Sequence, residues 1–365
     1  MSSKPKVIIL GGTGFVGRHM VRYLIENDLA SLIRVCDKNR PEMSWFTEPD
    51  FQLFKNPIVE YKMSNLVNEQ SVEKAFALDN NQQFDIVINL ATTGGYGKDA
   101  EFYEQKILRV ATVCGAEAKK RNIPKWIEVS TGQVYASSSK PSTETSHLKP
   151  WTALAASKLQ AEKVLLDMGF PCCIILRPAT IYGPGDITGL MPRIVIGAVY
   201  KHANKKMKLL WTSSLEVNTV HVVDVCAAIW FLVEHGKPGE IYNIVDKNKT
   251  DQGKINELVG KIFGIKTGFV GSVMSNFAKV NFKSIIEQVN DDHMQPWGEI
   301  TQKNNIDRTP LSPFLDPELL TNSPLSIDGS KLESLGYQIK VPAPTVENLR
   351  ESIDYWIAQK AFPPL

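Results

Sequence analysis

Three glycines near the start of the chain have the spacing of a phosphate-binding turn. Gly11, Gly14 and Gly17 follow an apolar run and open a segment whose apolar residues recur every three or four positions. A strand that ends in a glycine-rich turn and continues as a helix lets phosphate approach bare backbone, and the free N–H groups of the helix start point at it. The pattern predicts a pyrophosphate site, although the spacing alone also fits a tight strand–helix turn without a ligand.

An acidic residue supports this prediction. A second strand-like run ends in Asp37, twenty residues after Gly17, where a carboxylate can accept hydrogen bonds from the ribose hydroxyls of adenosine. The 2′-phosphate of NADP would meet a like charge here, so the two features together predict NAD. Lys38 and Arg40 are close enough in sequence to keep NADP open, and Asp37 could instead be a turn residue at the strand end.

The segments that must position these residues alternate between strand and helix patterns. Strand-like apolar runs occur at residues 59–63, 86–91 and 126–130, with helical patterns between them at 71–78 and 101–121. This alternation predicts an α/β fold with a doubly wound parallel sheet, Rossmann-like. Ligands of such sheets lie beyond the carboxyl ends of the strands. The functional candidates are therefore the residues that follow the strands: Asn65, Thr92, Thr131 and whatever follows Leu176.

Composition and charge argue against several classes of protein. The 365 residues are 43% hydrophobic with a formal net charge of +2, and they contain no dense Lys/Arg run of the kind that binds nucleic acid. The longest apolar run, residues 222–233, is interrupted by Asp224 and is too short to span a bilayer, and the first residues lack the apolar core of a signal peptide. The five cysteines have no metal-ligand spacing. We therefore expect a cytoplasmic protein that binds no metal, nucleic acid or membrane.

Several further segments resemble the extended short-chain dehydrogenase/reductase superfamily, which includes the NAD-dependent sugar epimerases and dehydratases and the 3β-hydroxysteroid dehydrogenases. Residues 35–42 resemble the steroid-dehydrogenase branch. The resemblance is specific to the superfamily and to no single member of it. It covers residues 1–265 and 325–360, and its segments are 11–17, 129–135, 156–162, 176–186, 220–225, 239–244 and 330–337.

The resemblance implies an active site made of a Ser or Thr, a Tyr and a Lys. In the family the Tyr phenolate takes the proton of the substrate alcohol, the Lys lowers the pKa of the Tyr and holds the nicotinamide ribose, and the Ser or Thr orients the oxygen. Thr131 and Lys158 match their positions, but Leu154 stands four residues before Lys158, where the Tyr belongs. A leucine transfers no proton, and that step is worth about 10²- to 10⁴-fold in rate. Lys106, where the family usually has an Asn, is a second departure.

The same resemblance implies further site residues. Three tyrosines, Tyr96, Tyr135 and Tyr182, could replace the missing base, although a tyrosine at each of these places is more often a wall or packing residue. The residues expected to line the substrate pocket are Tyr96, Thr131, Arg177 and Tyr182. The cofactor-binding residues implied are Gly11, Gly14, Phe15, Val16, Gly17, Asp37, Asn65, Leu66, Leu90, Ala91, Thr92, Lys158 and Pro178.

Two lobes are expected. Residues 1–180 with about 215–237 form an NAD(P)-binding Rossmann domain, and about 181–214 with 238–365 form a smaller C-terminal substrate lobe.

One stretch, residues 271–322, has no counterpart in the family pattern. We expect it to add helices to the second lobe, with His293 and Trp297 either lining a pocket or packing. Residues 346–359 predict a closing amphipathic helix.

Two hypotheses of function follow. The first, supported by Thr131 and Lys158, is an NAD-dependent epimerase/dehydratase-type oxidoreductase that acts on a sugar nucleotide or similar alcohol. The second, supported by Leu154 and Lys106, is a non-catalytic NAD(P)-binding sensor or scaffold. A redox-neutral reaction in which the nicotinamide stays bound is a third reading that the sequence does not separate from the first.

The resemblance also bears on partners. Relatives pair through two long helices that correspond to residues 101–121 and 153–168, which implies a homodimer.

Overall fold

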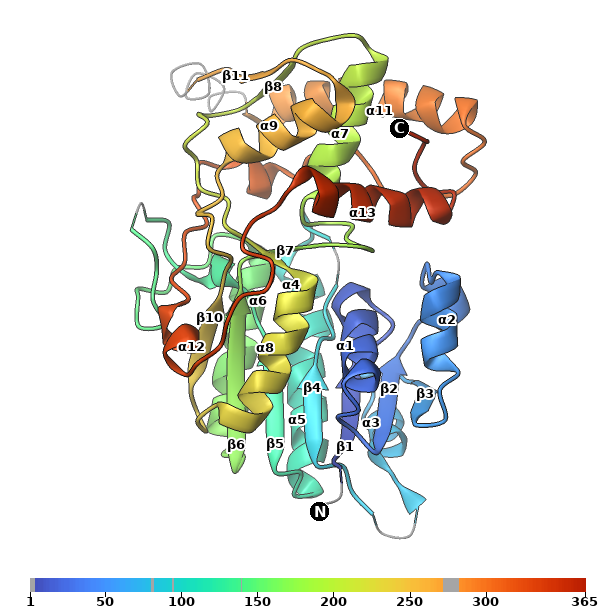
Figure 1. The fold of residues 1–365 in the computed structure, drawn as a ribbon. Helices are drawn as coiled ribbons and strands as arrows, with labels where there is room; N and C mark the ends of the chain where they lie inside the picture. The colour runs from blue at the N-terminus through green and yellow to red at the C-terminus, as the bar shows by residue number, and fades with distance from the viewer. Residues whose placement is uncertain (1–3, 80–81, 94, 139, 272–281) are drawn as a thin grey trace.

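The computed structural model describes residues 4–79, 82–93, 95–138, 140–271 and 282–365. A large parallel sheet with its covering helices lies below a smaller group of helices (Figure 1). The sheet has seven strands in the order β10-β6-β5-β4-β1-β2-β3, which confirms the predicted doubly wound α/β fold. The strands are β1 (Lys6–Leu10), β2 (Leu32–Asp37), β3 (Val59–Met63), β4 (Ile86–Asn89), β5 (Lys125–Val129), β6 (Cys172–Pro178) and β10 (Ile241–Ile244).

Strand β1 lies inside the sheet, between β4 and β2, and its side chains are apolar on both faces. Residues 7–10 have no exposed area, as expected for a strand covered by helices on both sides. Its backbone pairs in parallel with β2 and with β4. The order of the strands reverses between β1 and β4, and the crevice beyond their carboxyl ends is where ligands of such sheets bind.

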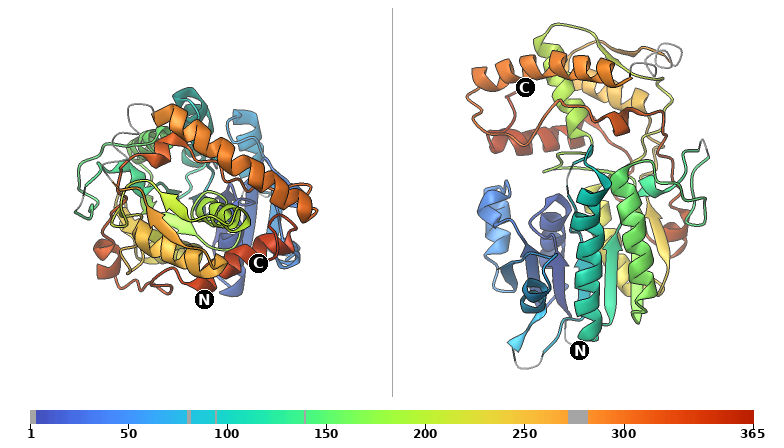
Figure 2. Two further views of the ribbon diagram at one scale, coloured as in Figure 1. Left: turned by 90° about the horizontal axis from the view of Figure 1, so that it is seen from above. Right: turned by 180° about the vertical axis from the view of Figure 1, so that it is seen from behind.

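Helices cover both faces of this sheet (Figures 1 and 2). On one face, α1 (Phe15–Glu26) and α8 (Val222–His235) share a hydrophobic core with the strands. On the other face lie α3 (Glu69–Phe76), α5 (Arg109–Lys120) and α6 (Ala153–Asp167). The short helix α2 (Glu48–Phe54) packs against α1 and β3.

The helix predicted over residues 101–121 is interrupted. A first turn, α4 (Ala100–Tyr103), is followed by a π-helical turn, η3 (Glu104–Leu108), before α5 begins. A π turn inserts one residue into the helical ladder, and apolar spacing of three and four residues does not reveal it. The turn buries Ile107 and leaves Lys106 exposed.

The smaller group of helices has its own hydrophobic core. It contains α7 (Met191–His202), α9 (Gln252–Phe263), α11 (Phe282–Lys303) and α13 (Val346–Ala358). The amphipathic helix predicted at the C-terminus is confirmed, since α13 buries Leu349, Ile353 and Trp356. The remaining elements are β7 (Thr180–Tyr182), β8 (Met207–Leu209), β9 (Thr219–His221), β11 (Thr267–Phe269), η1 (Pro41–Met43), η4 (Gly132–Val134), η6 (Pro317–Leu320) and α12 (Ser330–Ser334).

One boundary of the predicted lobes needs correction. The strand β10 falls within residues 238–365, which were expected to form the substrate lobe, but it pairs in parallel with β6 and forms an edge of the large sheet. Ile244 on this strand is fully buried in the core shared by α1 and α8. The four residues of β10 are too few for their periodicity to identify a strand of the sheet.

Candidate active site

The glycine turn leaves no room for side chains. Gly11 has φ +77°, and a Cβ atom on it would lie 2.7 Å from the Cα atom of Ala91. A Cβ atom on Gly17 would lie 2.5 Å from the carbonyl oxygen of Gly11. Helix α1 begins directly after Gly14, so the amides of Phe15 and the next residues have no acceptor within the helix. This cradle of bare backbone and free N–H groups fits a pyrophosphate.

Asp37 lies beside this turn, at the end of β2. Its Oδ2 atom accepts a hydrogen bond from the amide of Thr13 at 3.3 Å, and its Oδ1 atom accepts one from the amide of Asn39 at 3.0 Å. Both oxygens keep further lone pairs. The carboxylate is therefore fixed next to the turn and can still accept from a ribose. Lys38 and Arg40 are exposed on the loop that follows.

A buried arginine, which the sequence analysis missed, supports the turn from below. Arg18 donates to the carbonyl oxygens of Gly14 at 3.2 Å, Thr13 at 3.2 Å, Ser44 at 2.7 Å and Trp45 at 2.9 Å. Its guanidinium thus ties the glycine turn to the loop after β2. A charged residue directly after Gly17, on the buried side of α1, is the sequence signal for this role.

The strand ends bring some of the other predicted cofactor residues to this edge. Ala91 packs against Gly11, and the amide of Leu90 donates to the carbonyl oxygen of Leu10 at 2.9 Å. Pro178 ends β6, and its carbonyl oxygen would lie 3.2 Å from a Cβ atom on Gly132. Leu66 is buried in the core, whereas Asn65 and Thr92 are exposed at the ends of their strands.

Thr131 and Tyr96 are joined through a residue that the sequence analysis did not single out, Gln133. The Oγ1 atom of Thr131 accepts from the amide of Gln133 at 3.2 Å. The Gln133 side chain donates from Nε2 to the Tyr96 hydroxyl at 3.0 Å and accepts at Oε1 from the Thr152 hydroxyl at 3.0 Å. Thr152 is the N-cap of α6, so this chain of hydrogen bonds links the turn after β5 to the start of the helix that carries Leu154.

The predicted lysine faces an acidic residue rather than a tyrosine. Lys158 is 4% exposed, and its Nζ atom donates to the carbonyl oxygen of Val129 at 2.8 Å and lies 3.6 Å from Oε1 of Glu128. Burial raises the pKa of the Glu128 carboxyl, and the Lys158 ammonium opposes that rise. Leu154, one turn earlier on α6, is 9% exposed and packs in the core.

Burial dominates the pKa of all three tyrosines, and among the described residues only the Arg177 guanidinium, beside Tyr135, is a cation that opposes this rise. Burial raises the pKa of Tyr96 to about 12, and the nearby Glu318 carboxylate adds to the rise. Burial also raises the pKa values of Tyr135 and Tyr182. A phenol in such surroundings is protonated at neutral pH and is a poor general base.

Arg177 and Tyr182, expected at the substrate pocket, lie instead in the interior. Arg177 is 1% exposed. Its Nε atom donates to Glu162 at 3.0 Å and its Nη1 atom to the hydroxyl of Tyr135 at 2.9 Å. Tyr182 is fully buried, and its hydroxyl has no hydrogen-bond partner among the described residues. A guanidinium that is neutralised by Glu162 and covered on all sides couples β6 to α6 and does not face an open pocket.

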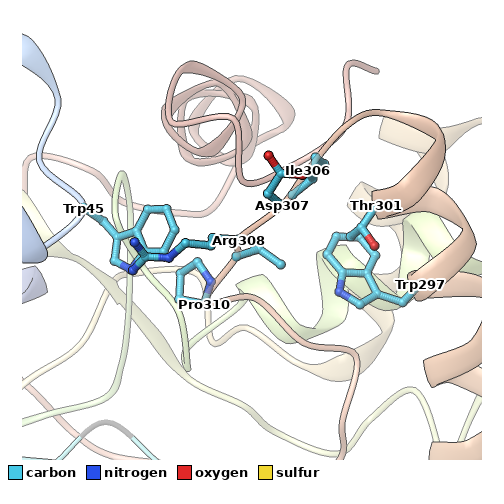
Figure 3. Close-up of a pocket in the computed structure, with 8 residues that line it drawn as sticks. Trp45, Trp297, Thr301, Ile306, Asp307, Arg308 and Pro310 are labelled. Carbon is cyan, nitrogen blue, oxygen red and sulfur yellow. The ribbon is translucent and has the colours of Figure 1, made fainter.

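Figure 3 shows an open cavity of about 490 Å³, and neither Arg177 nor Tyr182 is among the residues that line it. Its walls are Trp45, from the loop after β2, and residues of α11 and the segment after it, among them Trp297 and Arg308. The Arg308 guanidinium lies 5.5 Å from the centre of the Trp45 ring. His293, the other residue considered for a pocket, packs on the ring of Tyr200 instead.

The described part of the chain contains no group of three or more His, Cys, Asp or Glu side chains that could hold a metal ion. The five cysteines are free thiols. No helix in the described ranges has both the length and the apolar character needed to cross a membrane.

Comparisons with known proteins identify relatives of this chain. The model of the NAD dependent epimerase/dehydratase family matches residues 7–245. The chain is 25% identical to a dTDP-D-glucose 4,6-dehydratase of Bos taurus, over 100% of this chain and 94% of the relative.

Among the solved structures that share the fold are two enzymes of sugar nucleotides. One is the dTDP-glucose 4,6-dehydratase of Streptomyces venezuelae, solved with NAD bound, with a TM-score of 0.70, 18% identity and coverage of 96% of this chain and 97% of that one. The other is a UDP-glucose 4-epimerase of Thermus thermophilus in complex with NAD, with a TM-score of 0.68, 17% identity and coverage of 96% of this chain and 99% of that one.

Proposed function

Because the chain belongs to the NAD dependent epimerase/dehydratase family, we propose that it binds NAD and a sugar nucleotide and oxidises a hydroxyl of the sugar. The observation that carries this proposal is the cradle of Gly11, Gly14 and Gly17 with Asp37 beside it. The names of its relatives, dTDP-D-glucose 4,6-dehydratase and UDP-glucose 4-epimerase, support a sugar nucleotide as the substrate.

The residues of the cradle would divide the work of binding. The free amides at the start of α1 would bind the pyrophosphate, and Asp37 would accept from the adenosine ribose. Arg18 would keep the turn in shape through its four carbonyl contacts. When bound, NAD supplies the hydride acceptor. The Thr131 hydroxyl, at the carboxyl end of β5, would orient the oxygen of the substrate.

The proton of that hydroxyl must be taken by a group other than residue 154. Leu154 has no titratable atom, and the Lys158 ammonium is paired with Glu128 inside the protein. The usual division of labour between a Tyr and a Lys is therefore absent, and we propose that the site is atypical in its acid–base group.

A second candidate function is a non-catalytic NAD-binding protein. Two features favour it: the leucine at position 154, and the carboxylate that neutralises Lys158 at 3.6 Å. In this alternative the cradle would still bind NAD, and the protein would act as a sensor or scaffold whose state depends on whether NAD is bound.

Ligand binding and single-turnover chemistry separate the two functions. Thermal melts with NAD and with NADP should show stabilisation by NAD at lower concentration, since binding to the native state alone raises stability. The chain in excess is then mixed with NAD and either dTDP-glucose or UDP-glucose, while nicotinamide absorbance and sugar products are followed. Reduction that is lost in Thr131→Ala supports the enzyme. NAD binding without reduction on either sugar nucleotide supports the non-catalytic alternative.

A further inference from the structure

A carboxylate from the second lobe lies at the start of α6. Glu318, on the short turn η6, accepts at Oε2 from the amide of Ala153 at 3.2 Å and at Oε1 from the amide of Gly97 at 2.7 Å. Ala153 directly precedes Leu154, the position where the family has its tyrosine. Figure 2 (right) shows the orange-red turn η6 above the N-terminal end of α6.

Two buried side chains fix the segment that carries Glu318. The Asn290 side chain makes a pair of hydrogen bonds with the backbone of Leu315, one at 2.7 Å and one at 3.1 Å. The indole of Trp211 donates to the carbonyl oxygen of Leu320 at 2.9 Å. Asn290 and Trp211 are both nearly fully buried. Because the segment is held on both sides of Glu318, its carboxylate has a defined position before any ligand binds.

The surroundings of this carboxylate are the polar residues of the candidate site. Gly97, which donates to Glu318, follows Tyr96, and the Tyr96 hydroxyl is bonded to Gln133. Gln133 in turn bonds to Thr131 and to the N-cap of α6. Glu318 is therefore joined through backbone and side-chain contacts to the hydroxyl expected to orient the substrate. Asp316, on the same segment, is a second carboxylate close to Glu318, and Lys98 is close to Asp316.

We propose that Glu318 is the catalytic acid–base residue that replaces the tyrosine missing at position 154. This inference rests on the proposed function. The substrate O–H bond breaks and its proton goes to a carboxylate oxygen of Glu318. The C–H bond breaks and its hydrogen leaves with both electrons to the nicotinamide ring, so that the alcohol carbon is oxidised to a carbonyl while NAD is reduced. In the reverse direction, Glu318 returns the proton.

The geometry favours Glu318 over the other groups at this edge. The Glu318 carboxylate lies at the amides of Ala153 and Gly97, next to position 154, whereas burial raises the pKa of the Tyr96 phenol to about 12 and makes it a poor base. Lys158 is engaged by Val129 and Glu128. Glu318 is partly exposed at the junction of the lobes, where a ligand of the sheet edge would bind.

The test compares Glu318→Gln with Asp316→Asn, a matched loss of one charge from the same segment. Single-turnover reduction of NAD is measured with dTDP-glucose and with UDP-glucose. We expect Glu318→Gln to slow reduction by about 10²- to 10⁴-fold with NAD affinity unchanged. Its thermal midpoint should fall slightly, because glutamine keeps one of the two acceptor oxygens. Asp316→Asn should stay within about threefold of the parent chain. In Glu318→Ala, added formate should restore part of the rate, which a merely structural role would not allow.

The outcomes separate the inference from the function on which it rests. If the parent chain reduces NAD and Glu318→Gln does so at the same rate, Glu318 is not the acid–base residue, and the proposed function stands. If Glu318→Gln is slow but formate does not rescue Glu318→Ala and NAD affinity falls in parallel, the role of Glu318 is structural. If the parent chain binds NAD but reduces none of it, the proposed function fails and the role of Glu318 fails with it.

Discussion

Lys158 and Glu128 form a buried ion pair: Nζ lies 3.6 Å from Oε1, and the two side chains are 5% and 1% exposed. The second oxygen of Glu128 accepts from the Asn89 side chain at 2.6 Å and from the Trp126 indole at 3.2 Å. The lysine implied for catalysis by resemblance is thus part of a polar cluster between β4, β5 and α6. This arrangement has consequences for both stability and chemistry.

We expect Lys158→Met to lower the free energy of unfolding by about 3–5 kcal/mol, because it leaves the Glu128 carboxylate buried without its cation. The double variant Lys158→Met/Glu128→Gln should recover part of that loss, since neither member of the pair then leaves an unpaired charge in the interior. Urea unfolding of the two single variants and the double variant gives the coupling energy. Strictly additive losses would contradict the ion pair.

A second prediction concerns Arg18 and the glycine turn. Arg18→Met removes the donor to the carbonyl oxygens of Thr13 and Ser44. Hydrogen bonds from a charged group contribute about 1.5–3 kcal/mol to the free energy of unfolding, so we expect a loss of at least that size. We expect lower thermal stability and at least tenfold weaker binding of NAD, measured by calorimetric titration. The matched control is Arg22→Met, one turn later on α1, whose guanidinium is partly exposed and pairs with Asp50. Equal loss of NAD affinity in both variants would show that Arg18 has no special role.

Much of the fold could be predicted from local patterns. The apolar run of β1, the glycines after it and Asp37 are contiguous or follow at a fixed spacing. They predict a buried strand, a pyrophosphate-binding turn and a ribose-binding carboxylate. The π turn at 104–108 could not be predicted, because it changes the helix ladder without changing the spacing of apolar residues.

The residues of the site that were missed depend on contacts between distant parts of the chain. Glu318 and Ala153 are separated by 165 residues in the sequence. Residues 311–316, which lead to Glu318, form neither helix nor strand, so their apolar residues have no regular spacing from which the position of Glu318 could be predicted. Glu128 sits in a buried strand, where a charged residue signals a partner but does not say which one.

A third prediction concerns pH. The Nε2 atom of His19 lies 2.8 Å from the carbonyl oxygen of Pro184 and connects α1 to the second lobe. Burial lowers the pKa of His19 from 6.5 to about 4. The unfolded chain then binds a proton that the native chain does not, so the free energy of unfolding rises with pH between about 4 and 6.5, by at most about 3 kcal/mol from this group.

His19→Gln keeps a donor for the Pro184 carbonyl and removes the titration. We expect the gain in stability between about pH 4.5 and about pH 7 to be smaller in His19→Gln than in the parent chain, by about 1–3 kcal/mol. Urea unfolding at the two pH values measures it, with exposed His147→Gln as the control. A gain as large as that of the parent chain would show that His19 does not contribute.

The last prediction returns to position 154. Leu154→Tyr places a phenol one turn before Lys158 on the same face of α6. A tyrosine works as a base only where a neighbouring cation lowers its pKa, and here the ammonium faces Glu128. We therefore expect Leu154→Tyr alone to leave the slow reduction of NAD in the Glu318→Gln background almost unchanged.

Adding Glu128→Gln to that background should release the Lys158 ammonium to the new phenol. The combined variant Leu154→Tyr/Glu128→Gln/Glu318→Gln should then regain a measurable part of the about 10²- to 10⁴-fold that acid–base catalysis is worth. The measurement is single-turnover reduction of NAD with dTDP-glucose, and Leu154→Phe/Glu128→Gln/Glu318→Gln is the control without a hydroxyl. If Leu154→Tyr alone restores the rate of NAD reduction in full, Glu128 does not restrain Lys158. If the phenylalanine control also reduces NAD faster, the increase comes from packing and not from the hydroxyl. If Glu128 holds Lys158, the rate should rise only when Leu154→Tyr and Glu128→Gln are combined. A tyrosine acts as the base only when a free lysine ammonium lies beside it.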